Sequence, residues 1–409
     1  MNSTSTLPIN LNNERWADQR GAALIMTLMV STLLLIAGGA LIMSTSMTAG
    51  IAVDSTSELQ AYYAAEAGIN ASVNVLRGNI QSSPTGTTAN FDNAQSNPSL
   101  SNWLSYNGTI NGTSVVSLST SPQMGYTVAV SPVAGQASRL KLNVTGYGPK
   151  ASTKRMEMVV DRHIFDFSAQ ATVLMRGNDN GSSTMPAMAI GNSNAKEYSG
   201  YNHADPSSQS IPVFGVTHGN DYTNTMDEIT HAKPDTVTGV EKVKQFSTSS
   251  LPDFLQTADN ARAFLTSMKA TAVSNGRYFT STPDSFGSAS TPALTFVDGN
   301  CALQDGAGLL IVTGKLTGSG NVGFSGLILV LGEGVFERNG GGNGDTWGAI
   351  VVAKFARTWP SSENSLSHPF LSPSYDMNGG GNSTTGYDSD AIDKALSAVG
   401  IRPLAVREY

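Results

Sequence analysis

The chain has 409 residues and one cysteine, Cys301, so no disulfide can form within it. Charged residues make up only 13% of the composition, and the net charge of −7 is spread without blocks of Lys or Arg. Nucleic-acid binding depends on basic patches, so no nucleic-acid partner is expected. The 42 glycines, together with abundant Ser, Thr and Asn, indicate extended β structure outside the cytoplasm.

The most informative absence is that of charged residues from residue 21 to residue 53, directly after Arg20. Its apolar part, residues 22–43, is long enough as a helix to cross a bilayer core of about 30 Å. The first 21 residues are polar and lack the apolar centre of a secretory signal. Cleavage after Gly21 would therefore leave a membrane-spanning helix on the mature chain.

The junction Arg20-Gly21-Ala22 resembles that of the type IV pilin superfamily, in which prepilin peptidase removes a basic leader on the cytoplasmic side. Residues 60–69, QAYYAAEAGI, resemble the signature that follows the membrane segment in PilX-type minor pilins. The resemblance implies a single-pass protein of the bacterial inner membrane, in contact with lipid and assembled with other pilins. Its C-terminal part would lie outside the cytoplasm, and the leader would be processed at Arg20, Gly21 and Ala22.

One position departs from the pilin pattern, because Met26 stands where most major pilins have Glu at the fifth residue of the mature helix. A carboxylate inside lipid is costly unless it is paired, so Met26 removes a docking charge without harming insertion. The resemblance then implies a minor subunit at or near the filament tip. The alternative is a rare subunit that tolerates the loss anywhere in the filament.

The helix is expected to continue over residues 54–77 and to pack on the chain's own globular domain. Apolar residues recur there at spacings of three and four with one acid among them: Leu59, Tyr62, Glu66, Ile69, Val73 and Leu76. The alternative is that the upper part of this stripe packs against other filament helices, with Glu66 facing a basic partner. Met26, Tyr62 and Glu66 are therefore the candidate helix-assembly residues.

The pattern predicts an α+β protein in four parts: a leader (1–21), a transmembrane and N-terminal helix (22–77), a pilin-like antiparallel β-meander (78–165) and a mainly β C-terminal domain (166–409). The meander is expected from alternating strands at 125–130, 139–145 and 155–161. In the last part, helices are expected at 252–273 and 389–399. Apolar strands at 308–314, 324–332 and 347–353, about twenty residues apart, favour a β-solenoid, with an irregular sandwich as the alternative.

No local motif carries catalytic, cofactor-binding or metal-binding chemistry. Residues 318–323, GSGNVG, have the spacing of a dinucleotide fingerprint but precede a strand instead of the required helix. The acidic loop 375–393 lacks EF-hand spacing, and Asp388 or Ser389 is expected to cap the last helix. Cys301 is expected to be a buried structural thiol, and the chain is not expected to be an enzyme.

The sequence thus favours a minor pilin-like structural subunit of a type IV pilus or related filament, with a projecting β domain that serves adhesion. The first alternative is a membrane-anchored β-solenoid enzyme acting on polysaccharide, whose carboxylates would line a groove across the strands. The second is a tip pseudopilin of type II secretion.

The processing site yields a first prediction. Expression with active prepilin peptidase should shorten the chain by the 21 residues that end at Gly21, and Gly21→Val should abolish the cleavage. Intact mass of the membrane fraction, with and without the peptidase, measures this. An uncleaved N-terminus in a functional protein would contradict the prediction.

Overall fold

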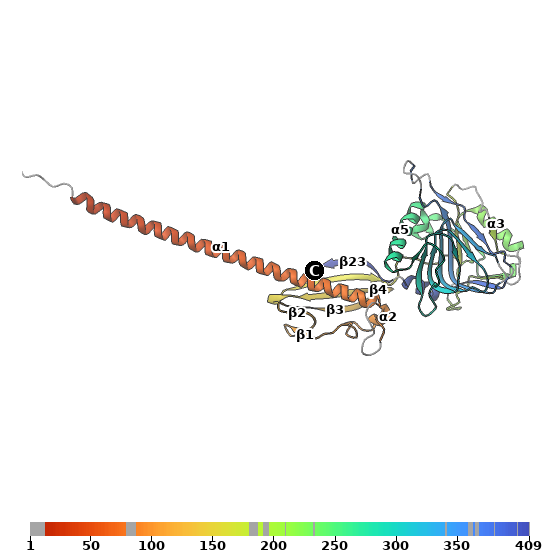
Figure 1. Ribbon diagram of the computed structural model, residues 1–409, viewed down its shortest axis with the longest axis horizontal. Coiled ribbons are helices and arrows are strands. Elements are labelled where there is room, and N and C mark those ends of the chain that lie inside the picture. The colour runs from red at the N-terminus through yellow and green to blue at the C-terminus, as the bar shows by residue number, and fades with distance from the viewer. Residues whose placement is uncertain are drawn as a thin grey trace, which may run out of the picture.

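The computed structural model describes residues 13–78, 87–179, 187–190, 196–208, 210–231, 234–339, 342–358, 363–364, 368–379, 381–398 and 400–408. A long helix, α1 (Asn13–Leu76), leads from the N-terminal side to a small antiparallel sheet, and a larger, mainly β region lies beyond that sheet (Figure 1). The chain is therefore α+β, with a long N-terminal apolar helix and a mostly β remainder, as expected from the sequence.

Helix α1 is continuous over 64 residues, which corresponds to about 96 Å at 1.5 Å per residue. No proline interrupts residues 13–76, and the pair Gly38-Gly39 lies inside the helix without a break. Apart from the chain neighbours and the backbone of the helix itself, no atom lies within 4 Å of the Cβ position at either glycine. The helix therefore extends alone for most of its apolar length.

The small sheet, here called the first sheet, runs in the order β1-β2-β3-β4-β5-β23, with every neighbouring pair antiparallel. The three strands expected at 125–130, 139–145 and 155–161 are confirmed as β3, β4 and β5. The bounds are β1 (Gly108–Ile110), β2 (Thr113–Thr120), β3 (Gln123–Val133), β4 (Gln136–Tyr147), β5 (Thr153–Asp161) and β23 (Arg402–Glu408), with α2 (Phe91–Gln95) before them and η1 (Pro149–Ala151) between β4 and β5.

The C-terminal strand β23 belongs to this first sheet, although the sequence assigned it to the domain 166–409. Arg402 pairs with Asp161 and Glu408 with Met156, so β23 lies antiparallel to β5. The pairing joins residues about 240 positions apart, and no local sequence pattern can specify it. The chain leaves the first sheet after β5, builds the outer region, and returns.

The C-terminal part of α1 lies on β3 and β4 through small residues. A Cβ at Gly146 of β4 would stand 2.1 Å from the carbonyl oxygen of Ala61, and a Cβ at Gly68 would stand 2.6 Å from Val144 Cγ1. Both distances are shorter than any real contact, so glycine is required on each side. Ala65 is fully buried in the same contact. Close approach of the two backbones therefore fixes the helix on the sheet.

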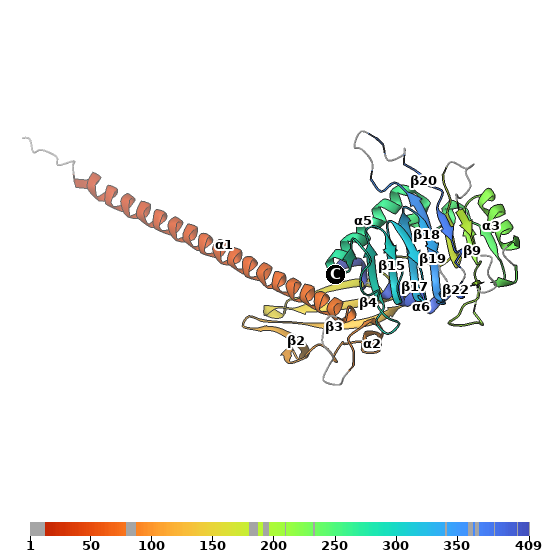
Figure 2. The same cartoon turned by 45° about the vertical axis from the view of Figure 1, so that its right-hand side comes forward.

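The outer region contains two further sheets, and Figure 2 labels β15, β17 and β19 of the larger one and β18 of the smaller one. The large sheet follows the order β10-β8-β22-β19-β17-β15-β13-β12, with β6, β9, β11 and β20 attached, and the smaller one follows β14-β16-β18-β21-β7. The large-sheet strands are β6 (Val173–Arg176), β8 (Lys196–Ser199), β9 (Phe214–Val216), β10 (Val237–Thr238), β11 (Val243–Gln245), β12 (Tyr278–Phe279), β13 (Ala293–Val297), β15 (Gly306–Val312), β17 (Phe324–Gly332), β19 (Thr346–Phe355), β20 (Phe370–Leu371) and β22 (Ser383–Tyr387). The smaller sheet has β7 (Ala187–Ala189), β14 (Cys301–Ala302), β16 (Lys315–Gly318), β18 (Val335–Arg338) and β21 (Ser374–Asp376).

Successive strands alternate between these two sheets from β13 to β18, and neighbours within each sheet are parallel. The apolar segments expected at 308–314, 324–332 and 347–353 are β15, β17 and β19, and Leu309, Leu327 and Ala349 stand in one row. One face of these strands packs into the space between the sheets, and the other packs under helices. Burial on both faces explains why the strands read as continuous apolar runs.

A row of glycines crosses the same strands. Gly308, Gly326 and Gly348 are register partners, with φ of 124°, 143° and 135°. A Cβ at Gly326 would stand 2.1 Å from the carbonyl oxygen of Gly308. L-residues with side chains rarely adopt this backbone conformation, so the row requires glycine in each strand.

The helices of the outer region differ from expectation at one point. The helix expected over 252–273 is divided into α4 (Asp253–Gln256) and α5 (Ala258–Ser274), because Thr257 is extended (φ −133°, ψ 151°) and its side chain accepts the Asn260 N–H. The last helix, α6 (Ser389–Ser397), is confirmed, with Asp388 as its N-cap. The remaining helices are α3 (Gly219–His231), η2 (Pro234–Thr236) and η3 (Thr248–Ser250).

Charged contacts join the first sheet to the outer region where the chain crosses between them. His163 Nε2 lies 2.6 Å from Asp393 Oδ1 of α6, and Arg162 lies 3.4 Å from the same carboxylate. The hydrogen bond to His163, helped by the charge of Arg162, lowers the pKa of Asp393. The backbone adds a bond from Ile164 N–H to the Leu396 carbonyl at 3.4 Å. Side-chain and backbone contacts therefore both hold α6 against the segment that follows β5.

The helix–sheet contact yields a second prediction. Gly146→Val should lower the free energy of unfolding by about 3 kcal/mol, because the new side chain would overlap the α1 backbone. Urea denaturation of the full chain in detergent measures the change. Gly219→Ala is the matched control, since only Gln245 Oε1, at 3.8 Å, lies near its Cβ position and the residue is helical. Equal stability of the two variants would contradict the close contact.

Candidate functional site: the exposed faces of the N-terminal helix

The apolar half of α1 makes no contact with the rest of the chain. Over residues 21–49 every position is exposed, and the side chain of Met26 is 70% exposed. Within the described residues, Gly21–Leu76 is the helical segment long and apolar enough to span a membrane. Large apolar side chains that face outward on every side of a helix need an apolar surrounding, either lipid or other helices.

The threonine hydroxyl groups of this segment are satisfied within the helix. Four threonines donate to carbonyl oxygens three or four residues earlier at 2.9–3.0 Å: Thr27, Thr32, Thr45 and Thr48. An unpaired hydroxyl in an apolar medium costs several kcal/mol, so this pairing makes the polar residues compatible with a bilayer.

The segment of α1 from residue 54 to residue 76 is called here its lower part. It has a buried face and an outward face, and the buried residues differ from the expected stripe. Ile69, Val73 and Leu76 are buried as expected, but Leu59 and Glu66 are exposed. Small residues occupy the buried face, and the side chain of Tyr63 is 57% exposed on the other. The expectation that the whole stripe packs on the chain's own domain is therefore wrong for Leu59 and Glu66.

The candidate helix-assembly residues are thus placed differently from one another. Tyr62 is half-buried against the first-sheet core, and its ring lies 5.9 Å, centroid to centroid and edge-on, from that of Tyr63. Glu66 faces outward, and Met26 lies in the segment without internal contacts. Sequence reasoning missed Tyr63, although the small residues at 61, 64, 65 and 68 recur at helical spacing and leave Tyr63 outside their face.

Polar contacts mark where α1 leaves the first sheet. Lys150 Nζ lies 2.9 Å from Asp54 Oδ1, and Ser152 Oγ donates to the Ser57 carbonyl at 2.8 Å. Lys154 Nζ lies 3.7 Å from Glu58 Oε2. Asp54 is the first charged residue after the uncharged run, so the anchored and unanchored parts of the helix meet at the polar boundary.

The processing residues lie in α1. Gly21 and Ala22 are exposed in the helix, and Arg20 belongs to the same helix by its backbone. Residues 1–12 of the expected leader lie outside the described part of the chain. Arg20, Gly21 and Ala22 are close to one another only because they are consecutive in the sequence. Cleavage at this position therefore stays a prediction.

Other candidate chemistries have structural explanations. The segment 318–323 is followed by strand β17, as expected. Cys301 is buried, and this burial raises the pKa of its thiol to about 11, so the reactive thiolate is disfavoured. Across the described residues, no group of three or more His, Cys, Asp or Glu side chains could hold a metal ion.

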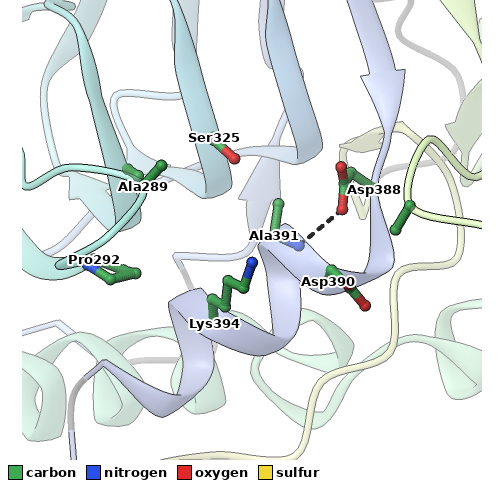
Figure 3. Close-up of a pocket in the computed structure, with 9 residues that line it drawn as sticks. Ala289, Pro292, Ser325, Asp388, Asp390, Ala391 and Lys394 are labelled. Carbon is green, nitrogen blue, oxygen red and sulfur yellow. Dashed lines mark hydrogen bonds between the residues drawn. The ribbon is translucent and has the colours of Figure 1, made fainter.

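A cavity of about 170 Å³ lies between the N-terminal turn of α6 and the start of β15 and β17 (Figure 3). Asp388 Oδ1 accepts the Ala391 N–H at 2.8 Å there, so that carboxylate is occupied as the helix cap. Ser325 and Lys394 line the same cavity from opposite sides.

Comparisons with known proteins extend these observations little. No family model matches the chain, and no curated protein matches it. Among solved structures, the chain is similar to the competence-associated pilin ComZ from Thermus thermophilus, at 13% identity over 87% of this chain and 98% of that one, with a TM-score of 0.20. So low a TM-score does not establish a common fold, and function is argued from the chain itself.

Fold and surface together define a class of protein: an α+β chain carried on one N-terminal apolar helix, with a helix-docked sheet and a mostly β outer region.

The two faces of α1 yield a third prediction. Ile69→Ala should lower the free energy of unfolding by about 3 kcal/mol, because it leaves a cavity in the buried contact. Tyr63→Ala should change it by less than about 0.5 kcal/mol, because that side chain faces outward. Urea denaturation measures both. A large loss for Tyr63→Ala would show that this face packs internally.

Proposed function

We propose that the chain is a minor pilin-like subunit, held in the bacterial inner membrane by α1 and assembled through that helix into a type IV pilus or a related filament. The observation that carries the proposal is the uncharged half of α1, exposed on all sides. The same apolar surface suits lipid before assembly and other pilin helices afterwards.

Processing precedes assembly in this proposal. Prepilin peptidase removes residues 1–21, which leaves Ala22 as the new N-terminus of a continuous apolar helix. Met26 then carries no charge that could pair with a neighbour's terminal amine. We propose a position at or near the filament tip for this reason, because a tip subunit has no neighbour beyond it to pair with.

The outward face of the lower helix provides the second contact with neighbouring subunits. Leu59, Tyr63 and Glu66 are exposed there, on the side opposite the first sheet. An aromatic ring beside a carboxylate suits a partner surface that combines apolar area with a basic side chain. The pairing of β23 with β5 supports a firmly attached outer region.

The outer region projects beyond the first sheet, at the end opposite the membrane helix (Figure 1). Its two parallel ladders, with strands alternating between them, support a short β-solenoid. We propose that it serves adhesion at the filament end and has a structural instead of a catalytic role. A pseudopilin of type II secretion would use the same helix in the same way.

Filament incorporation tests the proposal. The full chain, expressed in a host with an active pilus system, should appear in sheared filaments only when the peptidase is active. Tyr63→Ala should reduce its amount there about tenfold at unchanged membrane level, because an exposed aromatic is a typical interface anchor. Immunoblots of the sheared and membrane fractions measure this.

Val240→Ala is the matched control, since Val240 is 80% exposed on the outer region and should leave incorporation unchanged. Presence of the wild-type chain in membranes and never in filaments, with the peptidase active, would overturn the proposal.

A further inference from the structure

We propose that the outer region binds a small oxyanion between its two parallel sheets, held by Lys196, Arg338 and Ser383. These three donors face the same interior, and within the described chain Arg338 Nη1 and Ser383 Oγ are buried without a hydrogen-bond partner. The inference does not depend on the filament role, because the site lies wholly within the outer region.

Two of the donors stand side by side on neighbouring strands. Lys196 of β8 and Ser383 of β22 are register partners in a parallel pair, about 4.8 Å apart. Side chains alternate along each strand, and burial shows which way these point: Lys196 is 2% exposed and Ser383 is also buried, whereas Glu197 is exposed. Both donors therefore face the interior.

The third donor comes from the opposite sheet. Arg338 ends β18, on the smaller sheet, and is 3% exposed. Its Nη2 donates to the Val322 carbonyl at 2.8 Å, which fixes the guanidinium. Within the described part of the chain, its Nη1 is buried without a hydrogen-bond partner, and so is Ser383 Oγ.

No carboxylate of the described chain forms an ion pair with either cation. Each nearby acid also has another partner: Asp345 accepts the Thr384 N–H at 2.9 Å, Asp376 accepts the Asn378 N–H at 3.0 Å, and Glu337 pairs with Lys315 at 2.5 Å. Residues 191–195, directly before β8, contain no acid.

The electrostatics agree with this geometry. Burial lowers the pKa of Lys196, and the charge of Arg338 lowers it further. Burial also lowers the pKa of Arg338, against the opposing influence of Tyr375, Asp345 and Tyr198, which face it. Two buried cations that repel each other are costly without an anion.

The chemistry of the donors selects the ligand. An ammonium, a guanidinium and a hydroxyl together suit several oxygens on one anion, as in phosphate or sulfate. The stacked rings of Phe336 and Tyr375, with centroids 5.3 Å apart, lie in the same interior. A bound oxyanion would link β8, β22 and β18 across the space between the sheets.

Calorimetry of the full chain in detergent, with inorganic phosphate as the probe at constant ionic strength, tests the inference. Wild type should bind one phosphate per chain and show a rising Tm with phosphate concentration. Ser383→Ala should weaken binding about tenfold, because one hydrogen bond to a charged ligand is lost. Lys196→Met should abolish the phosphate response and raise the Tm in phosphate-free buffer, because it removes a buried unpaired charge.

Lys244→Met is the matched control: Lys244 is half-exposed and pairs with Glu241, so this variant loses one positive charge outside the site and should bind phosphate as wild type does. Sulfate and acetate titrations separate a tetrahedral oxyanion from a carboxylate. Binding that survives both Ser383→Ala and Lys196→Met unchanged, or no binding of any of the three anions, would overturn the site.

Discussion

The rest of the structure depends on the close approach of the α1 backbone to strand β4. Gly146 faces the Ala61 carbonyl and Gly68 faces Val144 at distances that leave no room for a side chain. This contact holds the lower part of a helix about 96 Å long, so the apolar part can extend away without internal support. The position of the outer region follows from the same contact, because it is joined to the sheet that the helix supports.

A second constraint shapes the outer region, where parallel strands are buried on both faces. Such strands must be apolar throughout, and the row Gly308, Gly326 and Gly348 lets neighbouring backbones keep an unusual conformation in register. Against that background the buried side chains of Lys196 and Arg338 are exceptional, since charges in such an interior need partners. The anchoring helix, the sheet and the outer interior thus carry separate tasks in one chain.

Patterns of short range were predictable from the sequence. The sequence predicted the alternating polarity of strands β3, β4 and β5. It also predicted the apolar, glycine-containing strands β15, β17 and β19 and the cap of α6 at Asp388. The break at Thr257 was not, because that residue suits both a helix and a cap. The outward position of Leu59 and Glu66 was also missed, because spacing of three and four does not say which of two faces a sheet will cover.

By itself the sequence determined the uncharged helix, the order of helix, meander and mainly β region, and the lack of local catalytic motifs, since these depend on composition and on neighbours a few residues apart. Tertiary structure alone decided that β23 completes the first sheet, that small residues form the helix contact, and that Lys196 and Ser383 stand side by side as register partners. These features join positions far apart in the chain, and only the packing of complete sheets brings such positions within reach of one another.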